Sequence, residues 1–105
     1  MQDSKRQTYL TLPQLIEELE NNDTSGFPPI LVVNEIGVIM EEDPSVSVRT
    51  NAEAFLVKLL NNTKNELPLR CNAYTFLSLS EKQSEDAKKV IEAFRKENPV
   101  AAEEV

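Results

Sequence analysis

The chain repeats a short pattern of residues, and this repeat constrains its fold more than any other feature. The segment Arg49–Leu56 matches Arg70–Leu77 at five of eight positions, at a constant offset of 21 residues. In both copies apolar residues recur at intervals of three and four, as on one face of an α-helix. A unit this short holds one helix and its connection, and that helix buries its apolar face only against neighbours. The repeat therefore predicts adjacent helices of one stack.

Local signals predict where the helices lie. The spacing of apolar residues predicts helices near 12–21, 29–42 and 45–61, a fourth from Pro68 onward, and a fifth near 84–98. Thr11 and Gln14 match a capping box, and Ser84 is a suitable cap for the last helix. Asp43 or Ser45 can cap the third helix.

The segment 29–42 allows two interpretations. As a helix it is apolar nearly all round, so we expect it to be central and buried, with Gly37 allowing the close approach of a neighbour. The same residues are rich in β-branched side chains, and Asn34–Gly37 matches the turn of a β-hairpin.

A resemblance to a known family favours the helical interpretation. The run Val38–Leu56 resembles a HEAT repeat, with an apolar helix end followed by Asp-Pro, Val-Arg, Ala and Leu, and Leu67–Ala73 is similar to a second copy. The chain is also similar, over Leu15–Leu79, to short uncharacterised archaeal proteins of HEAT-like helices. It departs from them at Pro28–Ile30 and in its fifth helix. The resemblance implies an all-α fold, a short HEAT-like α-α superhelical stack of about five helices, and implies no function.

Two repeat-equivalent pairs are the candidate site residues. The resemblance implies a structural role for Arg49, paired with Asp43 in the preceding turn. Arg70 has Glu66 as a local counterpart, or it contacts a partner protein. Asn51 and Asn72 form the second pair, because stacked amides can form a ladder that donates to and accepts from an extended peptide. The alternative is that each asparagine bonds an adjacent loop or a neighbouring helix.

Composition excludes several kinds of chemistry. The chain has no His and one cysteine, Cys71, so it lacks the commonest general base and cannot form an intrachain disulfide or a cysteine-built zinc site. We expect no catalytic, cofactor or metal site. The net charge is −7, and the run from Gln7 to Val48 holds eight acids and no Lys or Arg. This distribution counts against nucleic acid as a partner, since binding it requires a basic face.

A non-catalytic protein-binding module or assembly subunit is the function that we expect. One alternative is a small carboxylate enzyme using Tyr9 or Tyr74, which needs acids converging in one cleft. Another is a nucleic-acid accessory protein acting through the last helix, where bases are mixed with acids.

The overall organisation follows from length and hydropathy. We expect one domain over 1–105, with 1–10 and 99–105 flexible. No apolar stretch approaches the ~20 residues of a membrane span, and the polar start matches no export signal, so we expect a cytoplasmic protein. The excess of apolar residues in the second helix predicts a twofold homodimer.

Overall fold

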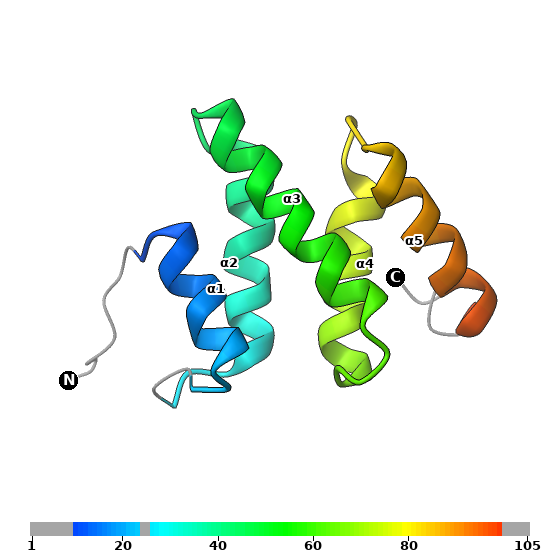
Figure 1. The fold of residues 1–105 in the computed structure, drawn as a ribbon, viewed down its shortest axis with the longest axis horizontal. Coiled ribbons are helices and arrows are strands. Elements are labelled where there is room, and N and C mark those ends of the chain that lie inside the picture. The colour runs from blue at the N-terminus through cyan, green and yellow to red at the C-terminus, as the bar shows by residue number, and fades with distance from the viewer. Residues whose placement is uncertain (1–9, 24–25, 100–105) are drawn as a thin grey trace.

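The computed structural model describes residues 10–23 and 26–99, and within them the chain folds into five helices. Their bounds are α1 Leu12–Glu20, α2 Pro29–Glu42, α3 Val46–Asn61, α4 Leu67–Leu79 and α5 Glu85–Glu97 (Figure 1). These residues contain no strand, so the predicted all-α stack is confirmed and the hairpin at 30–40 is excluded. The expected flexible ends, 1–10 and 99–105, lie outside the described residues except at Leu10 and Pro99.

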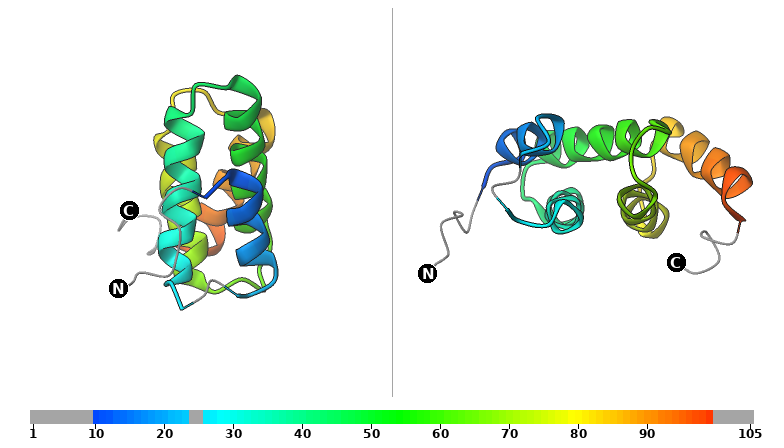
Figure 2. Two further views of the ribbon diagram at one scale, coloured as in Figure 1. Left: turned by 90° about the vertical axis from the view of Figure 1, so that its left-hand side faces the viewer. Right: turned by 90° about the horizontal axis from the view of Figure 1, so that it is seen from below.

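The helices form two layers that alternate along the chain. α1, α3 and α5 make one layer, and α2 and α4 make the other (right-hand view in Figure 2). α3 lies in the middle and packs against each of the other four helices, while α2 also packs against α4. Helices that follow one another therefore lie in opposite layers, and helices two apart lie side by side.

Side chains just outside the helices determine where several of them begin. The side chain of Thr11 accepts a hydrogen bond from the Gln14 N–H, and the Gln14 side chain accepts one from the Thr11 N–H. Ser45 and Ser84 likewise accept from the third N–H of α3 and α5. These bonds satisfy donors that every helix N-terminus leaves without a partner. The predicted caps are confirmed, and the cap of α3 is Ser45 rather than Asp43.

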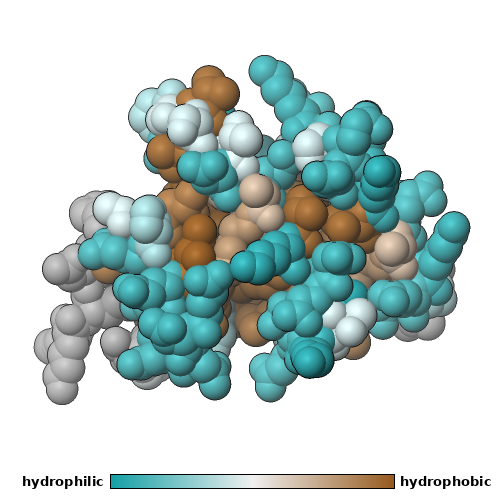
Figure 3. Space-filling view, in the orientation of Figure 1, coloured by the Kyte–Doolittle hydropathy of each residue, from teal (hydrophilic) through white to brown (hydrophobic). Residues whose placement is uncertain are grey.

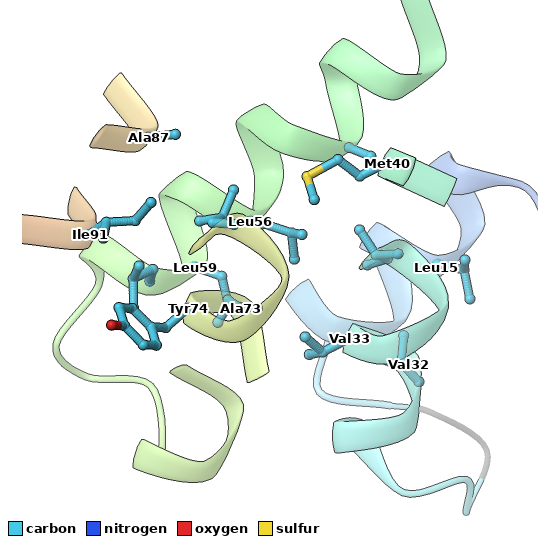
Figure 4. Packing of buried hydrophobic residues seen from close by; sticks show 14 of the residues in the cluster. Leu15, Val32, Val33, Met40, Leu56, Leu59, Ala73, Tyr74, Ala87 and Ile91 are labelled. Atoms are coloured by element: carbon cyan, nitrogen blue, oxygen red, sulfur yellow. The ribbon is translucent and has the colours of Figure 1, made fainter. Parts of the chain in front are cut away.

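One hydrophobic core runs through the stack. Equivalent positions of the repeat share it, since Ala52 and Ala73 are fully buried and so are Leu56 and Leu77. The small alanines let helices approach, and each buried leucine contributes about 1.5–3 kcal/mol. Figure 4 shows side chains of all five helices gathered in this core. The predicted apolar seam between the two copies is thus present.

Gly37 allows α2 and α4 to come into close contact. A Cβ atom added at this position would overlap the ring of Phe76 on α4. The prediction that Gly37 permits a close helix approach is confirmed, and Phe76 is the side chain that uses the space.

The expectation that α2 is central and buried holds for only one side of the helix. One side of α2 faces the other helices, but Leu31 is 40% exposed and Val38 is 46% exposed on its opposite side. The two residues are seven apart, so they lie on the same face of the helix. Among the described residues, three helices pack against α2: α1, α3 and α4. None of the three covers the face that carries Leu31 and Val38.

Candidate functional site

Arg49 fastens the junction between α2 and α3. Its Nη1 donates to the carbonyl oxygen of Asp43, which is the C-cap residue of α2. The Asp43 carboxylate is used differently, because its Oδ1 accepts from the N–H of Ser45 at 2.9 Å. Arg49 and Asp43 therefore meet where the resemblance placed them, but through the main chain rather than as an ion pair.

Arg70 lies inside the molecule and is only 8% exposed. Its Nε donates to the carbonyl of Leu60 at 2.9 Å, and a terminal nitrogen lies 3.3 Å from a carboxylate oxygen of Glu97. The guanidinium carbon is 5.2 Å from the centre of the Phe94 ring. Its carboxylate counterpart is thus Glu97 on α5 rather than Glu66. This burial counts against the predicted contact of Arg70 with a partner protein.

The two arginines have the same role in their copies of the repeat. Each side chain donates to a main-chain carbonyl at the C-terminal end of the preceding helix, Arg49 at α2 and Arg70 at α3. Those carbonyls have no acceptor role within the helix itself, and a cation there also opposes the negative end of the helix dipole. The repeat is therefore visible in the contacts as well as in the sequence.

Asn51 and Asn72 do not form a ladder. Asn51 is exposed on α3, whereas Asn72 is half-buried between α4 and α2. A ladder requires equivalent residues on helices of the same layer, and α3 and α4 belong to opposite layers. Positions that are equivalent in the repeat consequently point to different sides of the stack.

The partner of Asn72 is Asn34 on α2. The Asn72 Nδ2 donates to the Asn34 Oδ1 at 2.7 Å and lies 3.3 Å from the carbonyl oxygen of Ile30. Among the described residues nothing bonds the Asn34 Nδ2 or the Asn72 Oδ1. The pair therefore keeps one donor group and one acceptor for another molecule. Asn34 had a signal in the sequence, since it and Glu35 are polar within an otherwise apolar stretch of α2.

This amide pair lies on a surface that we call the outer face, the side of the α2/α4 layer turned away from α1, α3 and α5. Helical spacing places Leu31, Asn34 and Val38 there on α2, and Asn72, Thr75 and Leu79 on α4. Leu79 is 74% exposed. The outer face thus combines exposed apolar side chains with amides that have bonding capacity to spare.

A hollow lies elsewhere, between the α2–α3 turn and the loop that joins α4 to α5. It has a volume of about 560 Å³ and is the notch at the top of Figure 3. Its lining includes three carboxylates, from Glu41, Glu53 and Glu81. One Glu53 oxygen accepts from the Ser84 N–H at 3.0 Å. In the described part of the chain no three His, Cys, Asp or Glu side chains gather closely enough to hold a metal ion.

The tyrosines of the enzyme alternative give it little support. Tyr9 lies outside the described residues, and Tyr74 is buried. The Tyr74 hydroxyl accepts from Arg95 Nε at 2.8 Å, and this bond raises the pKa of Arg95 above its ordinary value. The raised pKa means that the fold favours the charged guanidinium, so its contribution to stability is present at pH values below the ordinary pKa of arginine and is lost as the pH rises through the raised one.

A second hollow, of about 360 Å³, lies beside the C-terminal half of α3. Phe55, Leu19 and Leu69 form its apolar part, and Lys58 lies 3.4 Å from a carboxylate oxygen of Glu20 at its edge. Phe55 and Phe76 are equivalent in the repeat, yet Phe55 lines this groove while Phe76 packs on Gly37. Apolar side chains are also visible on both sides of α3 in Figure 3.

None of the described helices has both the length and the apolar content to cross a membrane. No protein-family model, curated protein or solved structure matches the chain.

Proposed function

We propose that the chain is a non-catalytic protein-binding module that holds a segment of another protein against the outer face. The observation that carries this proposal is the Asn34–Asn72 pair, which keeps a donor and an acceptor beside the exposed Leu31 and Val38. A peptide main chain offers a matching acceptor and donor at every residue. Apolar side chains of that peptide would cover the two exposed residues of α2.

The proposed architecture of the module is a short HEAT-like stack. Two features support it: the alternation of layers along the chain, and the matched contacts of Arg49 and Arg70 with the end of the preceding helix. In such a stack the helices of one layer share a face, which suits the binding of a segment across two helices.

The test compares the wild-type chain with variants of the outer face. Leu31→Ser/Val38→Ser removes the apolar side chains, and Asn34→Ala removes the spare amide donor. Asn34→Ala leaves Asn72 its contact with the Ile30 carbonyl, so the fold should be kept. Each variant is used to capture proteins from the native host, and each captured protein is then purified and titrated by calorimetry.

We expect the outer-face variants to bind a purified partner at least tenfold more weakly. The matched controls are Asn51→Ala, an exposed asparagine on α3, and Val46→Ser, an exposed valine at the start of α3. Both controls should bind like the wild type. Equal binding by all variants, with helical circular dichroism unchanged, would contradict the proposal.

A further inference from the structure

The charges on the outer face indicate which class of partner this face can bind. α2 carries Glu35, Glu41 and Glu42 and no base, while α4 carries no acid and one base, Arg70. The Arg70 side chain is buried against Phe94 and Glu97, so it is not available on the outer face. The helices of this layer therefore present no exposed cation.

The acidic residues of α2 lie close to its exposed apolar residues along the helix. Val38 follows Leu31 by seven residues and precedes Glu42 by four, so the three lie along one side of the helix. Glu41 stands beside Glu42 at the same end, and both residues are exposed, although Glu41 also lines the 560 Å³ hollow with Arg49 and Lys82. A segment that covers Val38 consequently places its next side chains beside Glu42, with Glu41 one residue away.

The wider distribution of charge points in the same direction. The run from Gln7 to Val48 holds eight acids and no base, whereas residues 49–99 hold nine bases and seven acids. α1 and α2 therefore form an acidic end of the stack, and α2 brings that charge to the outer face. The negative potential of this end attracts basic segments and repels acidic ones. Its main effect is on the specificity of binding, and its effect on affinity is smaller.

The same charges argue against a second copy of the chain as the occupant. A twofold contact through the outer face would set this face of one copy against the same face of the other. Glu41 and Glu42 would then meet no opposite charge, because neither α2 nor α4 offers an exposed base to pair with them. Acids without a charged partner in a contact oppose binding.

We infer that the segment bound at the outer face is basic and amphipathic, with Lys or Arg side chains flanking the apolar side chains that cover Leu31 and Val38. This inference rests on the proposed function and adds the chemistry of the partner. The bases would lie over Glu41 and Glu42, and the apolar residues would lie between α2 and α4.

Three synthetic peptides test the charge requirement. They share one length and one set of leucines, and their remaining positions are all Lys, all Gln or all Glu. Each peptide is titrated into the full isotope-labelled chain, with fluorescence anisotropy for affinity and NMR chemical shifts for location. We expect the Lys peptide to bind at least tenfold more tightly than the Gln peptide, to shift signals of α2 and α4, and to weaken with added salt.

Variants separate the apolar requirement from the charge requirement. Leu31→Ser/Val38→Ser should weaken both the Lys and the Gln peptide, whereas Glu41→Gln/Glu42→Gln should weaken only the Lys peptide, by five- to tenfold. Glu17→Gln/Glu92→Gln is the matched control, because it removes two exposed charges from α1 and α5. That control should change the affinity less than twofold.

The outcomes distinguish the inference from the function on which it rests. Equal binding of all three peptides, or equal effects of the two charge variants, would overturn the basic partner and leave the binding module intact. If no peptide binds and the purified partners ignore the outer-face variants, the proposed function fails as well. The remaining outcome is a stable dimer at low salt that the Leu31→Ser/Val38→Ser substitutions dissociate. That result would show that a second copy binds the outer face, and it would overturn the inference.

Discussion

The Arg70 side chain connects three helices. From α4 its side chain bonds the last turn of α3 and reaches Phe94 and Glu97 on α5. A buried cation is costly unless it has partners, and here one nitrogen donates to a carbonyl, another lies beside a carboxylate, and the guanidinium lies over an aromatic ring. Its contribution therefore comes from several contacts that are lost together.

Replacement of Arg70 should show this dependence. We expect Arg70→Ala to lower the free energy of unfolding by about 2–3 kcal/mol, because the Leu60 carbonyl loses its donor and the core loses a packed side chain. Arg70→Lys should recover only part of the loss, since lysine lacks the planar fork. Urea denaturation followed by circular dichroism measures both.

The partner acid provides the comparison. Glu97 is about half-exposed, so Glu97→Gln should cost less than about 1 kcal/mol. If Arg70→Ala proved as mild as Glu97→Gln, Arg70 would have no role beyond an exposed ion pair.

At the scale of helices, the contact of α2 with α4 depends on the absence of one methyl group. An alanine inside a helix normally stabilises it by about 0.5–1 kcal/mol relative to glycine. At Gly37 the added Cβ would overlap the ring of Phe76, so the propensity gain competes with steric overlap. Overlap of this kind costs about 1–3 kcal/mol, which is the larger effect.

We therefore expect Gly37→Ala to destabilise the chain by about 1–2 kcal/mol, against the usual direction. In the background of Phe76→Leu, the same substitution should become neutral or stabilising because the ring is gone. Thermal unfolding of the four proteins of this double-mutant cycle measures the coupling. Equal effects of Gly37→Ala in both backgrounds would show that the two residues do not interact.

The start of α5 is a second local determinant. The Ser84 hydroxyl oxygen accepts from the Ala87 N–H at 3.1 Å, and the Ser84 N–H donates to Glu53 of α3. We expect Ser84→Ala to cost about 1 kcal/mol, the usual effect of losing a cap. Ser47→Ala, at an exposed serine inside α3, should cost nothing. Chemical denaturation compares the two, and equal stabilities would contradict a capping role.

These helices also show which structural features could be predicted from a single sequence. Helix bounds and caps were predictable because they depend on residues within one turn, such as Thr11 with Gln14. The Asn51–Asn72 ladder was wrong because the side to which a residue points depends on the layer of its helix. The exposure of Leu31 and Val38 was missed for a related reason: apolar spacing within α2 does not reveal how many helices cover it.

At the scale of the whole molecule, we expect the acids on α1 and α2 to control association. The predicted twofold homodimer stays a prediction, and charge sets its condition: contact through the outer face is opposed at low salt and eased when salt screens the acids. The screening length is about 10 Å at 0.1 M salt and about 3 Å at 1 M. The same salt weakens a basic partner, so the two kinds of contact respond in opposite directions.

Light scattering after gel filtration measures this response. At 20 mM NaCl we expect the mass of one chain, 11.9 kDa. At 1 M NaCl and high protein concentration the mean mass should rise, and it should not rise for Leu31→Ser/Val38→Ser. Association that weakens with salt would mean that opposite charges, rather than the outer face, hold the copies together.

The parallel course of α2 and α4 has a consequence for electrostatics. Both helices run upward in Figure 1, so their C-terminal ends lie at the same edge of the layer. Glu41 and Glu42 are at this edge, because they are the last two residues of α2. Peptide dipoles give each such end a partial negative charge of roughly half a unit. At α2 the Arg49 guanidinium, which donates to the Asp43 carbonyl, offsets part of this charge. The rest belongs to the backbone, so a weaker preference for cations should survive even where every carboxylate nearby has been neutralised.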